Sequence, residues 1–491
     1  MQMAATIFEA VSRVFFVLAL SWYLITNLQW FSYRFDRLVF HHTKPLWNLG
    51  YFVLPIALYY SAAAFDGRIF WVFFYFLYIP TLFLWYRKLD KKLVITARVK
   101  RFFALILFAA IAFEMACGFI LEKSGAGGIL FSLIAAIAAS QILENFMRSR
   151  FKAIAKKKLI SRREKGLITI ALTASYGKTS LKHFLAKILA AKFSVYFTPG
   201  NVNTDLGIAA DINNKLPNDA QIYIIEAGAR ERGDILTIAN MCEPEYVIIG
   251  KVGKQHIEYF GSIEEIQKTK RELLSSPRMS CAVVHESAGA VDENSGEIAT
   301  LHDEQISNIK ATLEGTEWDL EIADRKIHIK TAVLGSFNAI NISLAFLMAR
   351  ELGIDEKESL NAIEKLQNYD HRLQPIKTAN KFILDDSYNG NLEGMIASIE
   401  LCKNYDGRRV IVTPGIVESD DESNILLAQK INEVFDLVLI TGALNAPTLC
   451  EHIDRNKRKR IFDKRDLETI LAAETRAGDL ILFANDAPSY V

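Results

Sequence analysis

The chain has 491 residues, enough for two to four domains, and a formal net charge of only +1. Its five cysteines are scattered without a CxxC pair, which argues against a zinc site or a disulfide framework and fits a reducing compartment. Hydrophobic residues make up 51% of the chain, slightly high for a soluble protein, and the excess lies in the first 150 residues.

Five long apolar runs occupy this N-terminal third. Each approaches the ~20 residues that a helix needs to cross the hydrocarbon core of a membrane. The runs lie at 14–33, 46–65, 69–86, 102–121 and 129–147. A cleaved signal peptide is disfavoured because more runs follow the first and no small-residue cleavage site closes it. We therefore predict a five-helix transmembrane domain over residues 1–150.

The charges between the runs predict an orientation. The segments after the first, third and fifth runs are rich in Lys and Arg, whereas the other two loops hold only Arg68 and Lys123. Because cytoplasmic loops carry the excess of basic residues, the N-terminus is expected outside and the last ~325 residues in the cytoplasm. The sequence thus predicts a multi-pass protein of the inner or plasma membrane, with a basic linker at 151–165.

Glu114 lies inside the fourth run. An acid within a membrane span is a functional hypothesis by default. The sequence offers no obvious basic partner for it, so a hydrogen-bonded residue facing the bundle interior is the favoured interpretation. An ATP-driven transporter is disfavoured because polar, paired residues are scarce in the runs.

Strand-like and helix-like segments alternate from Gly166 onward. The strand-like runs lie at 166–174, 194–198, 222–228, 246–253, 382–388, 408–415, 437–442 and 480–486. This alternation is typical of an α/β fold with a largely parallel sheet. About 320 residues are too many for one open sheet, so we expect two α/β domains, 166–370 and 371–491. The polar segment 367–375 is the predicted hinge between them.

The stretch ALTASYGKTS, residues 171–180, contains the last three residues of a phosphate-binding loop motif, Gly177, Lys178 and Thr179. It follows a predicted strand and opens a predicted helix, where free N–H groups and the helix dipole attract anions. Lys178 would neutralise the β- and γ-phosphates, and the Thr179 hydroxyl would bind Mg²⁺. The three residues alone are a common match by chance.

Two later strand ends strengthen this interpretation. Glu226 ends one predicted strand and His256 follows the next, at the sheet edge where ligands of open α/β sheets collect. A carboxylate and an imidazole near a threonine hydroxyl can form part of a divalent-metal shell. A surface glutamate and a loop histidine are the alternatives.

Taken together, these residues resemble the Mur ligase family, the ATP-dependent amide ligases of peptidoglycan precursor synthesis. That family has a shorter loop, G-x-x-G-K-[ST], from which this chain departs at Ala174. Segment 198–207 is similar to the family's T-x-G-N segment, and 335–341 resembles G-x-H-N-x-x-N with Phe337 at the histidine position.

The C-terminal part carries a further resemblance. Segment 371–391, with D-D-S-Y-N, looks like the start of the family's C-terminal domain. Within the family it favours members that add D-alanyl-D-alanine to a UDP-N-acetylmuramoyl-tripeptide through an acyl phosphate. The resemblance implies a P-loop-type central domain with a mostly parallel sheet, followed by a Rossmann-like C-terminal domain.

The resemblance also implies roles for individual residues. Catalysis falls to Lys178, His256 and Lys270, the last at a position that is carbamylated in many members. Two Mg²⁺ are implied, with ligands from Thr179, Glu226 and His256. The implied ATP contacts are Ser175, Tyr176, Gly177, Lys178, Thr179, Ser180, Asn338, Arg372 and Asp386. The implied substrate contacts are Asn201, Asn203, Thr204, Ser387, Tyr388, Asn389 and Asn391.

One departure opens alternatives. The family's N-terminal domain, which holds the uridine diphosphate of the substrate, is replaced here by apolar runs. A related ligase that acts on a lipid-linked or polyglutamate-type acceptor is one alternative, and a membrane scaffold with an inactive ligase domain is another. The expected partners are UDP-muramoyl-tripeptide, D-Ala-D-Ala, membrane lipid and other membrane cell-wall enzymes, with no nucleic acid.

Overall fold

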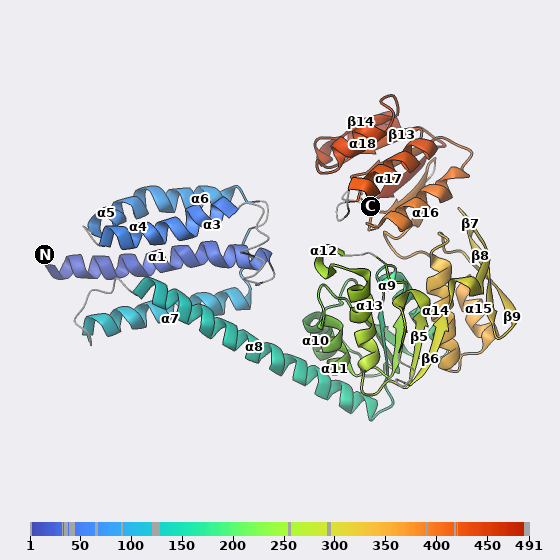
Figure 1. Cartoon of the computed structure of the whole chain (residues 1–491), viewed down its shortest axis with the longest axis horizontal. Coiled ribbons are helices and arrows are strands. Elements are labelled where there is room, and N and C mark those ends of the chain that lie inside the picture. Colours follow the sequence, from blue (N-terminus) through green and yellow to red (C-terminus); the bar gives the residue numbers. More distant parts are fainter. Residues whose placement is uncertain are drawn as a thin grey trace. The chain divides into compact units, whose positions relative to one another are not determined.

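The computed structural model of the chain describes residues 2–31, 33, 38, 45–63, 67–89, 92–119, 128–253, 257–291, 296–378, 380–388, 390–416, 419 and 421–485. The chain forms two compact units, Met1–Arg150 and Phe151–Val491. The first is helical, and the second carries the sheets (Figure 1).

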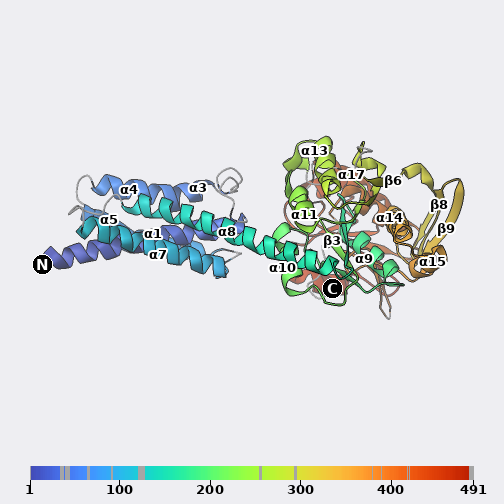
Figure 2. The same ribbon diagram turned by 90° about the horizontal axis from the view of Figure 1, so that it is seen from below.

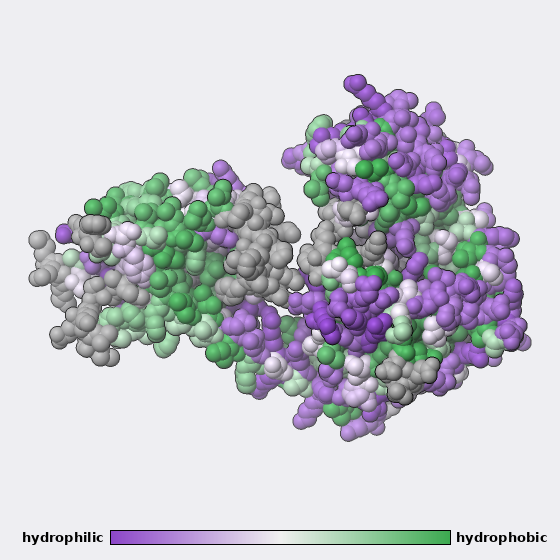
Figure 3. Space-filling view, in the orientation of Figure 1, coloured by the Kyte–Doolittle hydropathy of each residue, from purple (hydrophilic) through white to green (hydrophobic). Residues whose placement is uncertain are grey.

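The first unit consists of helices that pack around aromatic side chains. Its elements are α1 Gln2–Trp30, α3 Pro45–Asn48, η1 Leu49–Val53, α4 Leu54–Ala63, α5 Gly67–Phe73, η2 Phe74–Tyr78, α6 Ile79–Arg87, α7 Ala97–Phe119 and the first part of α8 Gly128–Arg163. Phe16 on α1 is fully buried and contacts Phe70 and Phe74 edge to face. Hydrophobic residues also gather on the visible outer face of this unit (Figure 3).

Three helices in the described part of the chain are long and apolar enough to cross a membrane, namely Ala5–Trp30, Gly67–Arg87 and Gly128–Arg163. They correspond to the first, third and fifth predicted runs. The second and fourth runs coincide largely with helices as well, α3 to α4 and α7, but these do not belong to the three. The structure thus supports a helical N-terminal region with three candidate spans, and the five-span arrangement stays a prediction.

Glu114 on α7 does have a basic partner, and the expectation that it lacks one was wrong. Arg13 on α1 donates from Nε and Nη2 to the two carboxylate oxygens of Glu114, at 2.8 and 2.7 Å. The partners are 101 residues apart in sequence, so only the packing of α1 against α7 reveals the pair. Glu114 is therefore a hydrogen-bonded residue of the helical unit, as the favoured interpretation held.

Breaking this pair on one side is expected to cost more stability than removing both partners. Arg13→Leu leaves the half-buried Glu114 carboxylate without its bidentate donor, and a loss of about 3 kcal/mol is typical when one partner of a buried pair is removed. Arg13→Leu/Glu114→Leu should recover most of the loss. Thermal unfolding in detergent micelles checks this order, and a double variant less stable than either single variant would contradict it.

The second unit begins with a six-stranded, all-parallel sheet of order β2-β3-β1-β4-β5-β6. Its strands are β1 Ile168–Thr173, β2 Val195–Phe197, β3 Ile222–Glu226, β4 Tyr246–Ile249, β5 Cys281–His285 and β6 Glu297–Leu301. The helices of this region are α9 Lys178–Leu189, α10 Asp205–Asn214, α11 Asp234–Cys242, α12 Ile257–Phe260, α13 Ile263–Arg271, α14 Asn338–Glu351 and α15 Glu356–Glu364.

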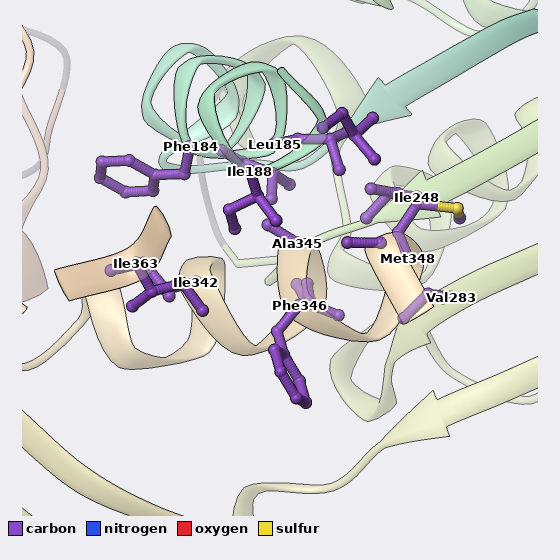
Figure 4. Close-up of a cluster of buried hydrophobic side chains, with 14 of the residues drawn as sticks. Phe184, Leu185, Ile188, Ile248, Val283, Ile342, Ala345, Phe346, Met348 and Ile363 are labelled. Atoms are coloured by element: carbon purple, nitrogen blue, oxygen red, sulfur yellow. The ribbon is translucent and has the colours of Figure 1, made fainter. Parts of the chain in front are cut away.

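Two apolar layers cover the two faces of this sheet because successive strand residues point to opposite sides. Ile170 and Leu172 of β1 belong to the layer with α9 and α14, whereas Ala171 belongs to the layer with α10 and α11. Figure 4 shows the first layer, in which Phe184 and Ile188 of α9 lie near the side chains of α14. Figure 2 shows β3 between α9 and α11. This packing fixes where α9 starts, and hence the loop before it.

A separate three-stranded antiparallel sheet, β7 Ile306–Thr312, β8 Gly315–Ile322 and β9 Arg325–Thr331, packs against α14 and α15. Trp318 of β8 is fully buried, and its indole N–H donates to Ser343 Oγ at 3.0 Å. The sequence analysis did not predict this sheet.

The C-terminal part holds a second six-stranded sheet of order β10-β11-β15-β12-β13-β14, parallel except for the edge strand β10. Its strands are β10 Gln374–Lys377, β11 Phe382–Asp386, β12 Arg409–Thr413, β13 Leu437–Ile440, β14 Arg458–Arg460 and β15 Leu480–Ala484. The helices are α16 Leu392–Lys403, α17 Asp421–Val434, α18 Ala446–His452 and α19 Leu467–Glu474. The prediction of two α/β parts is confirmed at this level.

The stretch predicted as a basic linker continues helix α8 up to Arg163. Ala155 and Leu159 are fully buried in the same apolar layer as α10 and α11. Arg162 donates to the carbonyls of Pro217 and Asn218. The end of α8 is thus an integral part of the second unit's core.

Candidate functional site

The loop between β1 and α9 has the backbone of a phosphate-binding turn. Gly177 caps α9 in the left-handed region at φ +73°, and a Cβ there would lie 2.5 Å from Nδ2 of Asn341. Only glycine fits such a position without strain. Ser175 fastens the loop, because its N–H donates to the Lys251 carbonyl at 2.9 Å and its hydroxyl to the Gly253 carbonyl at 3.1 Å. The loop is held in place before any ligand arrives.

Ala174, the departure from the family motif, is fully buried and has room for its methyl group. A Cβ built on Gly250, at the end of β4, would lie 3.0 Å from the Cβ of Ala174. The glycine therefore leaves the space that the alanine uses. Ala174 is accommodated by its neighbour rather than crowding the phosphate turn.

This pairing predicts a compensating pair of substitutions. Gly250→Ala should lower the free energy of unfolding by about 1–3 kcal/mol, because two methyl groups then compete for one space. Adding Ala174→Gly should recover most of that loss, and Ala174→Gly alone should leave ATP affinity unchanged. Thermal melts and nucleotide titrations of the three variants check this, and a double variant no better than Gly250→Ala would contradict it.

Lys178, the first residue of α9, points back over the loop. Its Nζ donates to the carbonyls of Ala174 at 2.8 Å and Ser175 at 3.2 Å. Burial lowers the pKa of Lys178 to about 8, and the positive charge of Arg372 acts in the same direction against the opposing effect of Glu226. An anion bound at the loop would stabilise the charged form of Lys178.

The lowered pKa predicts how nucleotide affinity depends on pH. Protonated Lys178 binds phosphate, and a bound polyanion raises its pKa, so binding takes up a proton above pH 8. ATP affinity should then fall by up to about tenfold per pH unit as the pH rises above 8. Calorimetric titrations from pH 7 to 9.5 measure this. Lys178→Met should bind weakly at every pH, and a persisting slope in that variant would assign the proton to another group.

Glu226, the last residue of β3, is the centre of a buried polar cluster. Its Oε2 accepts from Thr179 Oγ1 at 3.1 Å and from Lys182 Nζ at 2.9 Å. Its Oε1 accepts from Asn203 Nδ2 at 3.3 Å. Glu226 is 2% exposed and Lys182 is 0% exposed. The structure thus brings Thr179 and Glu226 together as predicted from the sequence, and adds Asn203, which was predicted as a substrate contact, and Lys182, which was not predicted.

The donor set at Glu226 fits part of a magnesium shell. A threonine hydroxyl and a carboxylate are hard oxygen ligands of the kind that Mg²⁺ takes, with water and phosphate as the others. His256, the remaining predicted ligand, lies outside the described residues. Within those residues, no group of three or more His, Cys, Asp or Glu side chains forms a metal cluster.

Lys270, on α13, is 4% exposed. Burial lowers its pKa well below the ordinary lysine value, and the charge of Lys178 acts in the same direction. A neutral amine is the form that can react with carbon dioxide. Such burial does not fit a lysine that only forms an exposed ion pair in a charged helix.

A cavity of about 430 Å³ lies next to the phosphate loop. Seven predicted residues line it, namely Tyr176, Gly177, Ser180, Asn338, Arg372, Asp386 and Asn391. Phe337, Ile306, Ile309 and Ile340 add an apolar wall. Lys251, which follows β4, and Glu393 on α16 form an ion pair at 3.3 Å and also line the cavity. A flat apolar group beside charged and amide groups fits such a cavity.

Part of this wall was not predicted from the sequence. Asp303 lies in the turn before β7, and Ile306 and Ile309 lie on β7, a strand of the unpredicted antiparallel sheet. Asn341 follows Asn338 by one turn of α14 and was within the quoted motif, so the helical spacing could have found it.

The hinge segment supplies the cavity's basic residue. Arg372 is surrounded by the left-handed residues His371 (φ +61°) and Leu373 (φ +53°). Burial lowers the pKa of Arg372, while Asp386 and Glu226 oppose that effect. Asp386 accepts from Leu373 N–H at 3.0 Å and from Ser398 Oγ at 2.6 Å. Asp386 therefore also holds the hinge to β11 and α16.

The other predicted substrate residues are spread around this site. Asn201 and Thr204 are exposed, and Thr204 caps α10. Tyr388 is exposed, while the N–H of Ser387 donates to Asp385. Asn391 caps α16 through the N–H of Gly394. Asn389 lies outside the described residues.

Comparison with known proteins agrees with this arrangement. The family model described as the Mur ligase middle domain matches residues 172–349, and the model described as the Mur ligase, glutamate ligase domain matches residues 371–485. Both matches lie within the second unit.

Curated relatives share the same region. The UDP-N-acetylmuramoyl-tripeptide–D-alanyl-D-alanine ligase of Bacillus subtilis is 24% identical over 338 residues, covering 65% of this chain and 73% of the relative. The ligase of the same name from Escherichia coli is 28% identical over 320 residues, covering 62% and 69%.

Solved structures share the fold. A D-alanyl-D-alanyl ligase from Acinetobacter baumannii superimposes with a TM-score of 0.61 at 23% identity, covering 69% of this chain and 76% of that one. A MurF ligase from Thermotoga maritima, in complex with ADP, gives 0.59 at 24% identity, covering 69% and 80%. With two successive domain models, named relatives and a shared fold, the chain belongs to the Mur ligase family.

Proposed function

We propose that this chain is an ATP-dependent amide ligase that adds D-alanyl-D-alanine to a UDP-N-acetylmuramoyl-tripeptide in peptidoglycan precursor synthesis. The names of its curated relatives support the reaction and both substrates. The D-D-S-Y-N stretch supports the same choice within the family.

The observation that carries the proposal is a phosphate loop that opens into a cavity lined by charged and apolar residues. Gly177 and Ser180 of the loop and helix α9 line the cavity together with Arg372 from the hinge, and the charge of Arg372 acts on Lys178. The apolar wall with Phe337 and Ile340, beside Asn338, suits the adenine of ATP. Ser175, Tyr176, Gly177, Thr179 and Ser180 would then surround the phosphates.

The reaction needs positioning and charge neutralisation more than covalent help from the protein. A carboxylate oxygen of the tripeptide attacks the γ-phosphorus, and ADP leaves as the bridging P–O bond breaks. The amine of the dipeptide then attacks the acyl carbon, phosphate departs with the electron pair, and the amine proton passes to solvent. Lys178 neutralises the transferring group, which is the main electrostatic demand.

Thr179, Glu226 and His256 would hold Mg²⁺, two ions in all. Bound Mg²⁺ neutralises phosphate oxygens during transfer. Carbamylation of Lys270 would convert a buried, neutral amine into an anion beside Lys178, and its low pKa supports that modification. His256 completes the proposed catalytic set.

Substrate recognition is assigned to two groups of side chains. Asn201, Asn203 and Thr204 follow β2 and face the muramoyl-tripeptide, whereas Ser387, Tyr388, Asn389 and Asn391 face the dipeptide. Because the nucleotide lies between the two α/β parts, we expect them to close on binding.

The helical unit would anchor the ligase in the inner or plasma membrane. Three candidate spans support membrane association, and the basic segments support a multi-pass arrangement with the catalytic domains in the cytoplasm. This proposal divides the chain into a membrane domain (1–150), a basic helical segment that packs on the central domain (151–165), a central domain (166–370) and a C-terminal domain (371–491). The anchor would keep the ligase near lipid and near membrane enzymes that use its product.

One assay tests the function directly. The purified protein in detergent should release phosphate from ATP only when D-Ala-D-Ala and UDP-muramoyl-tripeptide are both present. Phosphate release only with a lipid-linked acceptor would mean that the acceptor substrate is lipid-linked and not a UDP-muramoyl-tripeptide. No release with any acceptor would favour the scaffold.

A further inference from the structure

The buried ion pair of Lys182 and Glu226 is not explained by phosphate binding alone. Lys182 Nζ lies 2.9 Å from Glu226 Oε2 and also donates to the Gly200 carbonyl at 2.9 Å. Neither side chain reaches solvent, with 0% and 2% exposure. Two fully buried charges are costly to place, and removing one partner strands the other.

The position of the ammonium matters for the metal. Thr179 Oγ1 donates to the same Oε2 at 3.1 Å, so the lysine contacts the carboxylate oxygen that faces the phosphate loop. Glu226 also interacts with the charges of Lys178 and Arg372. A free divalent cation would therefore meet three positive charges around one carboxylate, and repulsion between close charges is strong where water is excluded.

We propose that Lys182 is a positioning residue that acts as an internal counter-cation. It keeps Glu226 aimed at the phosphate loop, and its charge makes metal binding at Glu226 depend on nucleotide phosphates. The metal then enters as a complex with the nucleotide, because the phosphate charges offset the local positive charge. This inference rests on the proposed function only in taking Glu226 as a metal ligand.

A purely structural ion pair predicts a different result for the metal. If Lys182 only joined α9 to β3, its removal would leave metal affinity unchanged or weaken it as the fold loosens. If Lys182 is a counter-cation, its removal should tighten binding of the free metal. The sign of the change separates the two roles.

The test titrates the full-length protein in detergent with Mn²⁺, with and without ADP, and without any acceptor substrate. The wild type should bind Mn²⁺ at least about tenfold more weakly without ADP than with it. Lys182→Met should bind free Mn²⁺ at least about tenfold more tightly than the wild type, and the difference should shrink when ADP is present. Lys182→Arg should resemble the wild type.

The matched control is Lys187→Met, at an exposed lysine on the same helix, which should titrate as the wild type does. Lys182→Gln removes the charge but keeps a donor for the Gly200 carbonyl, and replaces Lys182→Met if the methionine variant unfolds. Free Mn²⁺ binding in the charge-free variant that is no tighter than in the wild type would overturn the proposal. The wild type alone can also overturn the proposal, if it binds Mn²⁺ with the same affinity in the presence and in the absence of ADP.

The titrations also keep this proposal separate from the proposed ligase activity. Glu226→Gln should abolish the ADP-dependent Mn²⁺ binding, and unchanged binding would remove the premise. If the Mn²⁺ titrations give the expected results but no ligation is detected, the role of Lys182 is supported. Only the substrates named in the proposed function would then be wrong.

Discussion

Lys178→Met is expected to lower the turnover of ATP by about 1000-fold or more. Removing a preorganised charge from a developing phosphoryl or oxyanion centre typically costs this much. Lys178 is half-buried beside the turn that Gly177 requires, and its ammonium already lies over the phosphate loop. Phosphate release at saturating substrates measures the effect.

The control asks whether the loss of turnover is specific to Lys178 or follows from removing any lysine of the same helix. Lys187→Met removes an exposed ammonium from the same helix and should keep turnover within about twofold, as surface changes rarely matter. Lys178→Met should also keep or raise the melting temperature, because burial and nearby positive charge disfavour its ammonium. Wild-type turnover in Lys178→Met would contradict the enzyme assignment.

The sequence predicted the strands of both large sheets well because buried parallel strands leave a strong local signal. All eight predicted strand-like runs contain a strand, including β3, which ends at Glu226, and β11, which ends at Asp386, whereas β5, β6, β10 and β14 were not predicted. These strands are near-continuous apolar runs, as expected when both faces are covered. The phosphate loop was equally readable, because glycine, lysine and threonine must be consecutive there.

Contacts between segments that are far apart in the sequence could not be predicted from the sequence. Arg13 and Glu114 pair across 101 residues, and no local pattern links them. In the sequence, Lys182 looks like any other lysine of an amphipathic helix. Only the fold shows that Glu226 of β3 lies beside it. Strands β7 and β9 expose most of their side chains, so buried apolar residues do not form continuous runs and the apolar signal is weak.

Helix α8 was misread for a related reason. Its basic residues suggested a solvated linker, yet they contact the second unit in pairs and through backbone carbonyls. Lys152 pairs with Asp205 at 3.1 Å, Lys156 with Glu243 at 2.6 Å, and Arg163 with Glu243 at 3.5 Å. A high density of basic residues therefore does not distinguish a solvent-exposed helix from a helix whose basic side chains contact a neighbouring domain.

The docked end of α8 predicts where a soluble ligase can begin. A fragment that starts at residue 148 keeps Phe151, Ala155 and Leu159 in the core and should fold. A fragment that starts at residue 164 loses all three and the Arg162 contacts, and should be insoluble or melt well below the longer fragment. Equal stability of the two fragments would show that α8 contributes nothing to the fold.

A pair of neighbouring substitutions in the longer fragment isolates the cause. Leu159→Ala should lower the free energy of unfolding by about 2–5 kcal/mol, the usual cost of emptying a filled core position. Ile160→Ala, at a position 43% exposed, should change it by less than about 0.5 kcal/mol. Urea unfolding followed by tryptophan fluorescence gives both values. Both substitutions raise helix propensity, so a loss at Leu159 alone has to come from its burial, and similar losses at the two positions would contradict this explanation.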